Sequence, residues 1–426
     1  MLPMTDLTGK TVLLVVENLS VPCDPRVWRE ARTLREAGAT VVVVCPQCGN
    51  ECEPEVTIDG IHIYRYPLTF SNGTVMGYIR EYLFALLWTV VYFHRIWRHY
   101  GRIDVVHVAN PPDMFWPLGI YAQLLGAAFI FDEHDLSPET YLRQFEKSEQ
   151  QPGALYHVQK WMQRMSHRVA NAIISTNESY RAFAIAQNNA NTDKTFVVRN
   201  GPDTRFFYAA RPDPSLRMGR RFMAAYFGIM AIQDRVDYII RAAAYLVSER
   251  GMNDFIIYLI GDGDDVERLK QLVHELALDD HILFTGRIPA ADVRAREILS
   301  TADICLSPDP CTPLNHLCTA NKIMDYMAIG KPIVSFDLKE SRFSAGESAL
   351  YVENNSPQAF ADGMLALWTS PDRWASMSAY GQRRVKDALC WQQQAGNLLE
   401  VYSFVFGHTA GKSLNSRRRT SFLIEH

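Results

Sequence analysis

The sequence predicts an α/β protein made of two doubly wound domains in tandem. Its 426 residues exceed what one hydrophobic core normally organises. Short Val- and Ile-rich runs alternate with longer helical patterns in both halves, which is typical of parallel sheets covered by crossover helices. A polar stretch at 204–221, which contains Pro212 and Pro214, interrupts this alternation and is interpreted as a linker. We therefore expect domains at 1–203 and 204–390 that face each other across a cleft, with ligands at the carboxyl ends of the strands.

The first half of the chain supplies the elements of the first domain. Each strand candidate is a short apolar run rich in valine and isoleucine, and each helix candidate is longer and more polar. The expected strands cover residues 11–16, 40–45, 61–66, 104–108, 128–132, 172–176 and 195–198, and the expected helices include 24–37, 77–99 and 179–187.

The second half repeats the alternation. The expected strands cover residues 222–227, 255–261, 281–285, 304–307, 332–336 and 349–352, with helices between them. Beyond Pro357 the pattern is helical to about residue 406, and its last part, 391–406, has no strand left to pair with. We expect this last helix to return to the first domain. Residues 407–426 are polar and basic, and we expect them to form a disordered tail.

Composition and charge exclude several kinds of partner. With 43 Lys+Arg against 47 Asp+Glu, the formal net charge of −4 gives no general attraction to nucleic acid. The first ten residues lack a basic region followed by a long apolar run, so we expect no secretory signal and a cytoplasmic location. Eight cysteines in a chain of this length fit a reducing compartment. Cys45, Cys48 and Cys52 lack the second pair that a zinc site would need.

The most apolar segment, residues 82–93, is too short to cross a bilayer, which takes about 20 apolar residues. Arg95, Arg98 and His99 follow it, so a helix here would suit an anionic membrane surface. The alternative is a buried helix whose basic end reaches solvent. The sequence alone is consistent with both.

The loop and helix at 307–330 carry the clearest chemical signal. Three prolines prevent a helix over the first third, and the helical pattern begins near 318–319. The amino end of a helix attracts anions through its free N–H groups and its dipole. Lys322 adds a full charge there, and Asp325 lies on the same face, so phosphate and ribose hydroxyls would both find partners. The alternative is a surface ion pair between Lys322 and Asp325.

Several motifs occur in one order along the chain. MDYMAIGKPIV at 324–334 is the most distinctive of them. The stretches before it are, in order, DPRVWREARTLREAGATVVVV, DVVHVANPPD, DEHDLSPE, VVRNGPDTRFF, GIMAIQDRVDYIIRA, YLIGDGD, FTGRIP and STADICLSP. Motifs in a fixed order are far more specific than any one alone. Over about 11–391 the chain resembles glycosyltransferase family 4, in the branch found in bacterial surface-polysaccharide gene clusters.

This resemblance implies a GT-B fold and a retaining glycosyltransferase of EC class 2.4. Such an enzyme would move a sugar from a nucleotide-diphosphate sugar to a glycan or polyprenyl-linked acceptor in polysaccharide biosynthesis. The donor would bind the second domain and the acceptor the first. Because the apolar, basic-ended segment 82–102 lies in the acceptor domain, we expect a lipid-linked acceptor at the inner membrane face, with the chain bound there as a peripheral protein. Retaining members show no obvious protein nucleophile, so the leaving phosphate is expected to help deprotonate the acceptor. The resemblance implies no metal and no other cofactor.

The resemblance also assigns roles to single positions. Asp325 matches the acidic residue that holds the nucleotide ribose, and residues 286–288 match the segment whose backbone reads the base. His134 matches the histidine beside the transferred sugar, where it would position the sugar and stabilise charge. Gly201 matches the sharp turn at which the chain leaves the first domain, so a structural role is expected for it.

The chain departs from the family pattern at three places. Residues 17–22 replace the Gly-rich loop that usually follows the first strand. Ile229 and Asp234 stand where the family has the Arg and Lys of its diphosphate clamp. Leu317 replaces the family's first acidic residue. Because a departing diphosphate gains negative charge, other cations must take over the clamp.

The predicted site combines the matches with replacements for the missing groups. His134, Arg235 and Lys322 are the catalytic candidates. Asp262, Asp264 and Asp265 are interpreted as a turn that caps a helix and not as a metal site. The predicted donor-binding residues are Arg199, Gly228, Arg287, Ile288, Asn315, Asn321 and Asp325, and the predicted acceptor-binding residues are Asn18, Asp24, Arg26, Asp135 and Glu139.

Two alternatives to a transferase follow from the same sequence. One is a nucleotide-sugar epimerase or sugar-phosphate synthase of the same fold. The other is a degenerate, non-catalytic subunit that binds a partner transferase, because Ile229 and Asp234 remove charge from the clamp.

Overall fold

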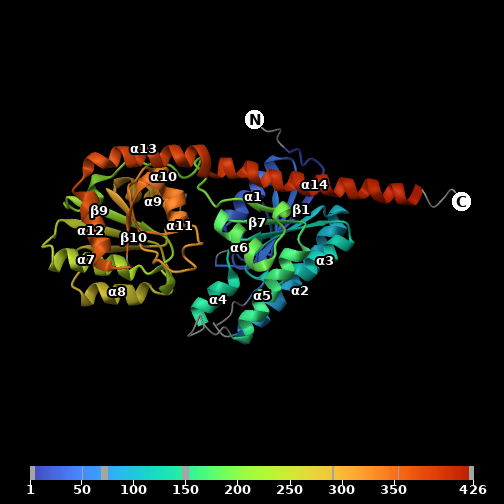
Figure 1. Ribbon diagram of the computed structural model, residues 1–426, viewed down its shortest axis with the longest axis horizontal. Coiled ribbons are helices and arrows are strands. Elements are labelled where there is room, and N and C mark those ends of the chain that lie inside the picture. The colour runs from blue at the N-terminus through green and yellow to red at the C-terminus, as the bar shows by residue number, and fades with distance from the viewer. Residues whose placement is uncertain are drawn as a thin grey trace. The chain divides into compact units, whose positions relative to one another are not determined.

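The computed structural model of the chain describes residues 5–49, 51–68, 75–145, 153–289, 292–353 and 355–421 (Figure 1). The chain forms two compact units: unit 1 is Met1–Arg199 with Ala395–His426, and unit 2 is Asn200–Gln394. Each unit is built on a predominantly parallel sheet accompanied by helices. The predicted pair of doubly wound α/β domains is confirmed.

The sheet of unit 1 has eight strands in the order β3-β4-β2-β1-β5-β6-β7-β8. Neighbouring strands are parallel, except that β3 pairs antiparallel with β4. All strands predicted for the first half are present, and β3 was not predicted. In chain order they are β1 (Thr11–Val15), β2 (Thr40–Pro46), β3 (Glu55–Ile58), β4 (Ile61–Tyr66), β5 (Val105–Ala109), β6 (Ala128–Glu133), β7 (Ala172–Ser175) and β8 (Thr195–Val197).

The helices of unit 1 include the three predicted ones and three that were not predicted. The first begins at Pro25 because the carboxylate of Asp24 accepts from the backbone N–H groups of Arg26 and Val27. The helices are α1 (Pro25–Glu36), α2 (Val75–Tyr100), α3 (Trp116–Leu124), α4 (Ser137–Phe145), α5 (Ala154–Val169) and α6 (Glu178–Asn188).

The last helix, α14 (Trp391–Ser421), leads from unit 2 into unit 1. Its residues Leu398, Val401 and Tyr402 are buried, and the hydroxyl of Tyr402 lies 2.9 Å from His107 Nδ1 on β5. The prediction of a disordered tail differs from the structure at 407–421, which is helical. This stretch contains no proline, and a glycine in a helix costs only about 1 kcal/mol. The rest of the predicted tail, 422–426, lies outside the described residues.

The sheet of unit 2 has six parallel strands in the order β11-β10-β9-β12-β13-β14. Along β9, Ala224 and Tyr226 belong to one buried cluster, whereas Met223 and Ala225 belong to another. This alternation shows that the sheet is covered on both faces, as the continuous apolar runs predicted. The strands are β9 (Phe222–Phe227), β10 (Phe255–Ile260), β11 (Ile282–Gly286), β12 (Ile304–Ser307), β13 (Ile333–Phe336) and β14 (Ala349–Val352).

The helices of unit 2 alternate with these strands. Their bounds are α7 (Asp237–Ser248), α8 (Val266–Glu275), α9 (Val293–Thr301), α10 (Asn321–Ile329), α11 (Lys339–Ala345), α12 (Pro357–Trp368) and α13 (Trp374–Arg384). Short 3-10 helices in the chain lie at Asp113–Phe115, Thr192–Lys194, Pro214–Arg217, Ile232–Asp234, Gly346–Ser348 and Pro371–Arg373, and a π-helical turn lies at Val385–Leu389.

The predicted linker at 204–221 is packed onto unit 2. The backbone N–H of Ala210 donates to Ser300 Oγ at 2.9 Å, and that of Asp213 donates to Thr301 Oγ1 at 2.9 Å. The stretch is irregular but fixed, because α9 supplies these hydroxyls at its end.

Gly201 lies at the start of unit 2. A Cβ at this position would come within 1.6 Å of the carbonyl oxygen of Leu389, so a side chain here would displace the backbone.

Among the helices of the described chain, none combines the length and the hydropathy needed to cross a bilayer.

Candidate functional site

The candidate donor site lies at the carboxyl ends of β9 and β12, beside the first turn of α10. Lys322 is in that turn, and its Nζ donates to both carboxylate oxygens of Asp309 at 2.9 Å. Asp309 follows β12 and accepts from Ser307 Oγ at 2.7 Å. The ammonium also lies 5.2 Å from the centre of the Tyr226 ring on β9. Residues of two strands thus hold one lysine charge at the edge where doubly wound sheets bind ligands.

Both members of this ion pair stay charged. Burial opposes the charge of Lys322, but Asp309 and Tyr226 raise the pKa of its ammonium above the ordinary value. Burial would likewise raise the pKa of Asp309, yet Lys322 and Ser307 hold this pKa below its ordinary value. The side chains of Lys322 and Asp309 are 11% and 18% exposed.

Asp309 is a site residue that the sequence analysis missed. The sequence left Asp325 as the alternative partner of Lys322, whereas the structure places Asp309 against it. A signal for Asp309 did exist, because this carboxylate lies two residues beyond the carboxyl end of a predicted strand.

Helix α10 begins at Asn321, slightly later than the predicted 318–319. Ala320 occupies the N-cap position and has no side chain that can accept from the first turn. Within the described part of the chain, the N-cap position of α10 therefore supplies no side-chain cap, which favours binding of an anion there. Asn321 is exposed at this end, and Asp325 follows one turn later, half-buried.

Asn315, predicted to bind the donor, shapes the loop before α10. Its Nδ2 donates to the carbonyl oxygen of Pro310 at 2.9 Å, and its backbone N–H donates to Thr312 Oγ1 at 3.1 Å. The side chain is 9% exposed. In this arrangement the amide holds the proline-rich loop in place.

The loop after β9 lets two backbones approach closely. A Cβ on Gly261, whose φ is +148°, would lie 1.8 Å from the carbonyl oxygen of Gly228. Ile229 follows and is 67% exposed. Asp234 accepts from the backbone N–H of Ala231 at 3.1 Å and thereby closes the turn.

Arg235 lies at the end of the same loop with a left-handed backbone, φ 51°. Its Nε donates to Asp237 Oδ1 at 2.9 Å, and its guanidinium lies 4.5 Å from the centre of the Tyr238 ring. Its side chain is 40% exposed. A cation is therefore present beside the position that lacks the expected lysine.

The remaining residues predicted at the donor site and its neighbouring turn follow β11 and β10. Arg287 is exposed after Gly286, and Ile288 packs against the core of unit 2. In the turn after β10, Asp262 accepts from the backbone N–H of Gly263 at 2.9 Å. Asp265 occupies the N-cap position of α8, where its carboxylate pairs with Arg268 at 2.5 Å and makes no cap hydrogen bond.

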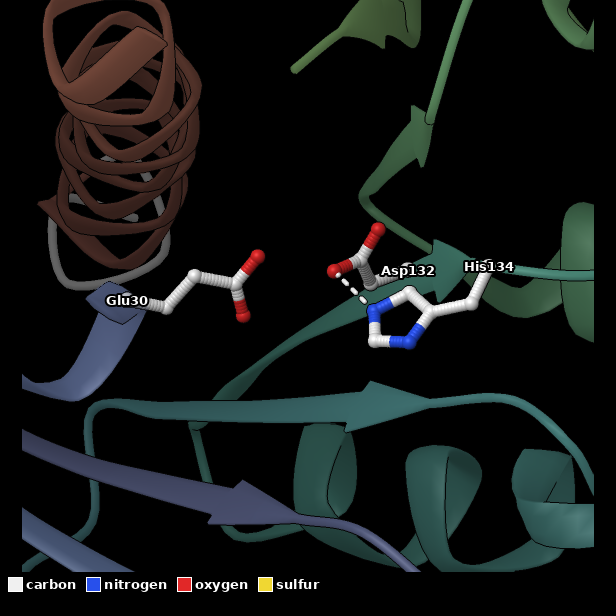
Figure 2. Close-up of side chains that lie close together, drawn as sticks. All are labelled: Glu30, Asp132 and His134. Carbon is white, nitrogen blue, oxygen red and sulfur yellow. Dashed lines mark hydrogen bonds and ion pairs between the residues drawn. The ribbon is translucent and has the colours of Figure 1, made fainter. Parts of the chain in front are cut away.

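In unit 1, a buried charge network surrounds His134 (Figure 2). Nε2 of His134 lies 2.7 Å from Oδ2 of Asp132, the penultimate residue of β6. Arg26 on α1 donates through Nε and Nη2 to Asp132 at 3.0–3.1 Å, and its Nε also lies 3.1 Å from Glu30 Oε1. The guanidinium donates further to the carbonyl oxygen of Val198 at 2.9 Å.

The network fixes the charges around the histidine. Burial would raise the pKa of Asp132, but Arg26 and His134 hold it well below the ordinary value. Burial and the neighbouring Asp132 raise the pKa of Glu30 well above the ordinary value. Burial lowers the pKa of His107, which lies 3.6 Å from Asp132. At neutral pH the network therefore combines a carboxylate, a guanidinium and a neutral His107.

Glu30, Asp132 and His134 are also close enough to share one cation, because their ligand atoms lie within 4.8 Å of one another. Arg26 Nε lies 2.9 Å from His134 Nε2 and 3.1 Å from a carboxylate oxygen of each acid. A metal ion would have to displace this guanidinium or bear its repulsion. The residues present do not fit a metal site.

Two predicted acceptor-binding residues are part of this framework. Asp24 is 5% exposed and caps α1, and Arg26 is 3% exposed and engaged as described. Their contacts hold His134 and the start of α1. Oδ1 of Asp24 and Nε of Arg26 are therefore already engaged and are not available to an acceptor.

Of the four other residues predicted in unit 1, Asn18 and Asp135 line a pocket of about 450 Å³, whereas Glu139 and Arg199 do not. Glu139, on α4, accepts from Lys160 Nζ at 2.8 Å. Arg199 is the last residue of the first segment of unit 1, and it is buried.

Two family models match the chain in succession. The one described as "Glycosyl transferase 4-like domain" covers residues 23–201, and the one described as "Glycosyl transferases group 1" covers residues 221–370. The chain is a member of glycosyltransferase family 4. The predicted enzyme class is thereby confirmed.

Curated relatives of this glycosyltransferase include two from Mycolicibacterium smegmatis. The alpha-maltose-1-phosphate synthase is 27% identical over 299 residues, which cover 66% of this chain and 73% of the relative. The GDP-mannose-dependent alpha-(1-6)-phosphatidylinositol monomannoside mannosyltransferase is 25% identical over 48% of this chain and 54% of its own length.

Solved structures show the same fold. The sucrose-phosphate synthase of Thermosynechococcus elongatus superposes with a TM-score of 0.73 at 17% identity, over 94% of this chain and 100% of that one. The Anabaena protein HepE in complex with UDP-glucose superposes with a TM-score of 0.68 at 16% identity, over 92% and 99% of the two chains. The predicted GT-B fold of this glycosyltransferase is confirmed.

Proposed function

We propose that this glycosyltransferase moves a sugar, with retention of configuration, from a nucleotide-diphosphate sugar to a glycan or polyprenyl-linked acceptor in polysaccharide biosynthesis. The observation that carries the donor part is the Lys322–Asp309 pair beside the uncapped amino end of α10. A cation, a helix dipole and free N–H groups together attract a diphosphate. The named relatives that use GDP-mannose or bind UDP-glucose support this choice of donor class.

In the proposed reaction the acceptor oxygen bonds to the anomeric carbon while the bond from that carbon to the diphosphate breaks. The acceptor proton passes to the leaving phosphate. The amino end of α10, Lys322 and Arg235 would stabilise the negative charge that develops there. Asp325 would bind the ribose, and His134, oriented by Asp132, would position the sugar. No metal or other cofactor is required by this scheme.

The test is a thermal-shift titration of the full chain against UDP, GDP, ADP and dTDP, because a ligand of the native state raises its stability. We expect one nucleotide to raise the Tm selectively and Asp325→Ala to abolish this shift. Asp279→Ala, at a carboxylate that is 62% exposed elsewhere in unit 2, is the matched control and should keep the shift. Stabilisation by none of the four would contradict the transferase.

Stabilisation by none of the four nucleotides would favour the non-catalytic subunit. One observation supports this alternative. The clamp positions hold an exposed isoleucine, Ile229, and an aspartate, Asp234, that is occupied in a turn. A sugar-phosphate synthase is the other alternative, since two relatives carry that kind of name. Analysis of the products formed with sugar phosphates as acceptors separates it from polysaccharide synthesis.

We further propose that unit 1 binds the cytoplasmic face of the inner membrane through α2. The helix buries Ala85, Thr89 and Phe93, so part of it is core. Its opposite side exposes a row of large apolar residues at helical spacing. These residues are Met76, Ile79, Leu83, Phe84, Leu87 and Val91. Arg98 and His99 are exposed at its end and would face anionic headgroups.

Flotation with phosphatidylglycerol–phosphatidylethanolamine liposomes tests the membrane proposal. The wild-type chain should float, and Leu87→Glu should remain in the bottom fraction, because Leu87 is 65% exposed in the middle of the row. Met218→Glu, at a residue of unit 2 that is 64% exposed, should float like the wild type. A wild-type chain that ignores these liposomes would exclude the proposal.

A further inference from the structure

The pocket of about 450 Å³ in unit 1 has apolar walls and a polar floor. Its walls come from α2, α4 and α5, which are labelled in Figure 1, and from the 3-10 turn after β5. Apolar side chains that line it include Tyr82, Leu83, Met114, Leu155, Val158 and Met162. Such walls favour the apolar part of a ligand.

Polar atoms without partners line the floor. Glu17 is 2% exposed and Asp113 is 5% exposed, and both line the pocket. Oε1 of Glu17, Oδ1 of Asn18 and Oδ2 of Asp113 are buried with no hydrogen-bond partner in the described part of the chain. A buried oxygen left without a partner is unfavourable, so a ligand that donates hydrogen bonds to these oxygens would be stabilised.

The acids of the floor also select the charge of the ligand. Burial and the neighbouring Glu81 on α2 raise the pKa of Glu17 to about 8. Burial raises the pKa of Asp113 to about 7, although its partner Asn110 opposes the rise. Any charge that these groups carry is negative, so a phosphate would be repelled. A neutral hydroxyl would be accepted.

The floor is tied directly to the loop of His134. Asn110 Nδ2 donates to Asp113 Oδ1 at 2.8 Å, and Asn110 Oδ1 accepts from the backbone N–H of His134 at 2.6 Å. One asparagine thus connects an acid of the pocket with the residue proposed to position the sugar. This connection places the pocket where the reacting end of an acceptor would be bound.

We propose that this pocket binds an uncharged amphiphilic acceptor. The apolar chain of the acceptor would lie between α2, α4 and α5, and its hydroxyl groups would donate hydrogen bonds to Glu17, Asn18 and Asp113. The proposal rests on the proposed transferase function and narrows its acceptor. The moiety in the pocket is a hydroxylated, glycolipid-like group, and a lipid phosphate is not bound there. The chain that leaves the pocket along α2 would continue toward the exposed row of this helix.

The experiment is a calorimetric titration of the full chain with octyl β-glucoside below its micelle concentration, compared with octyl phosphate. Both probes carry the same apolar chain, so they differ in the head alone. Octyl β-glucoside should bind saturably, and octyl phosphate should bind at least about tenfold more weakly, the equivalent of one lost hydrogen bond. Equal or tighter binding of octyl phosphate overturns the proposal, as does the absence of octyl β-glucoside binding.

Variants locate the binding in the pocket. Val158→Trp fills the pocket from α5, and Glu17→Leu removes the two Glu17 oxygens from its floor, so each should weaken octyl β-glucoside binding roughly tenfold or more. Leu124→Trp on α3, where Leu124 is 79% exposed and does not line the pocket, should bind as the wild type does. Unchanged affinity in both Val158→Trp and Glu17→Leu would show that the probe binds elsewhere and overturn the proposal.

The nucleotide titration of the same preparations tests the transferase function separately from the amphiphile site. A chain that binds a nucleotide but not octyl β-glucoside keeps the transferase function and loses this acceptor class. A chain that binds octyl β-glucoside in the pocket but no nucleotide keeps the amphiphile site and loses the transferase function.

Discussion

Lys322 Nζ lies 2.9 Å from both carboxylate oxygens of Asp309, so the first turn of α10 is joined to the end of β12 by an ion pair. The carboxylate already neutralises the ammonium. A diphosphate that arrives at α10 therefore meets a helix dipole and a pair of opposite charges, and not an isolated cation. Asp309 keeps Lys322 protonated and oriented, at the cost of competing for it with the ligand.

This competition predicts opposite effects of the two partners on donor binding. Asp309→Asn keeps the shape of the side chain and leaves the charge of Lys322 to the diphosphate, so the affinity for the bound nucleotide should rise. Lys322→Ala should lower it. Both changes leave a largely buried charge without its partner, and each should lower the free energy of unfolding by about 2 kcal/mol, less than for a fully buried pair. Calorimetry and denaturant unfolding measure the two effects, and a loss of affinity in both variants would contradict the argument.

Gly261 predicts a second, purely steric effect on the donor site. A Cβ there would lie 1.8 Å from the carbonyl oxygen of Gly228, and the φ of +148° is unfavourable for any other residue. Gly261→Ala should lower the free energy of unfolding by more than about 3 kcal/mol and weaken nucleotide binding, because the loop after β9 must move. Gly251→Ala is the control, since its φ is +62° and nothing lies within 4 Å of its Cβ. Gly251→Ala should lower the free energy of unfolding, measured with urea, by only about 1 kcal/mol and leave nucleotide binding intact. An equal loss of stability in both variants would show that the backbone φ, and not the steric contact, causes the loss.

The fold was largely predictable because the apolar runs that form buried parallel strands are short and continuous. β3 escaped prediction because Glu55–Ile58 is a four-residue edge strand whose side chains are exposed or half-buried, so it has no apolar run. Helix α3 escaped because Trp116–Leu124 is apolar on most sides and lacks the helical alternation. The helical continuation at 407–421 escaped because its polar composition is also typical of disorder.

The site was predictable only where neighbouring residues in the sequence define it. The start of α10 with Lys322 could be read from local prolines and charge. Asp132 and Arg26 lie 106 positions apart, and no spacing rule brings them together before the sheet order is known. The pocket floor is of the same kind, because Glu17 and Asp113 follow different strands and meet at one edge of the sheet.

Glu17 predicts how stability depends on pH. Its pKa is raised by burial and Glu81 from 4.5 to about 8, so between these values the folded chain binds more protons than the unfolded chain. The free energy of unfolding should therefore fall as the pH rises from about 4.5 to about 8, by at most about 1.4 kcal/mol per unit. Glu17→Gln should remove this contribution, so the variant gains on the wild type as the pH rises. Urea unfolding at several pH values measures the difference, with Glu267→Gln, at a side chain that is 86% exposed, as the control. A constant difference across this range would show that Glu17 ionises normally in the folded chain.

Substitution of Arg235 separates the effect of its charge on turnover from its effect on stability at the altered clamp. Its left-handed φ of 51° strains any residue with a Cβ, and its pair with Asp237 is partly exposed, so the pair contributes little to stability. Arg235→Gly relieves the strain while it removes the guanidinium, and Arg235→Ala removes the guanidinium alone. Both variants should unfold within about 1 kcal/mol of the wild type, with the glycine variant the more stable of the two. Turnover should fall at least about tenfold in both, because the leaving diphosphate loses a cation in the transition state. Full activity in both variants would assign the clamp to Lys322 and the amino end of α10 without Arg235.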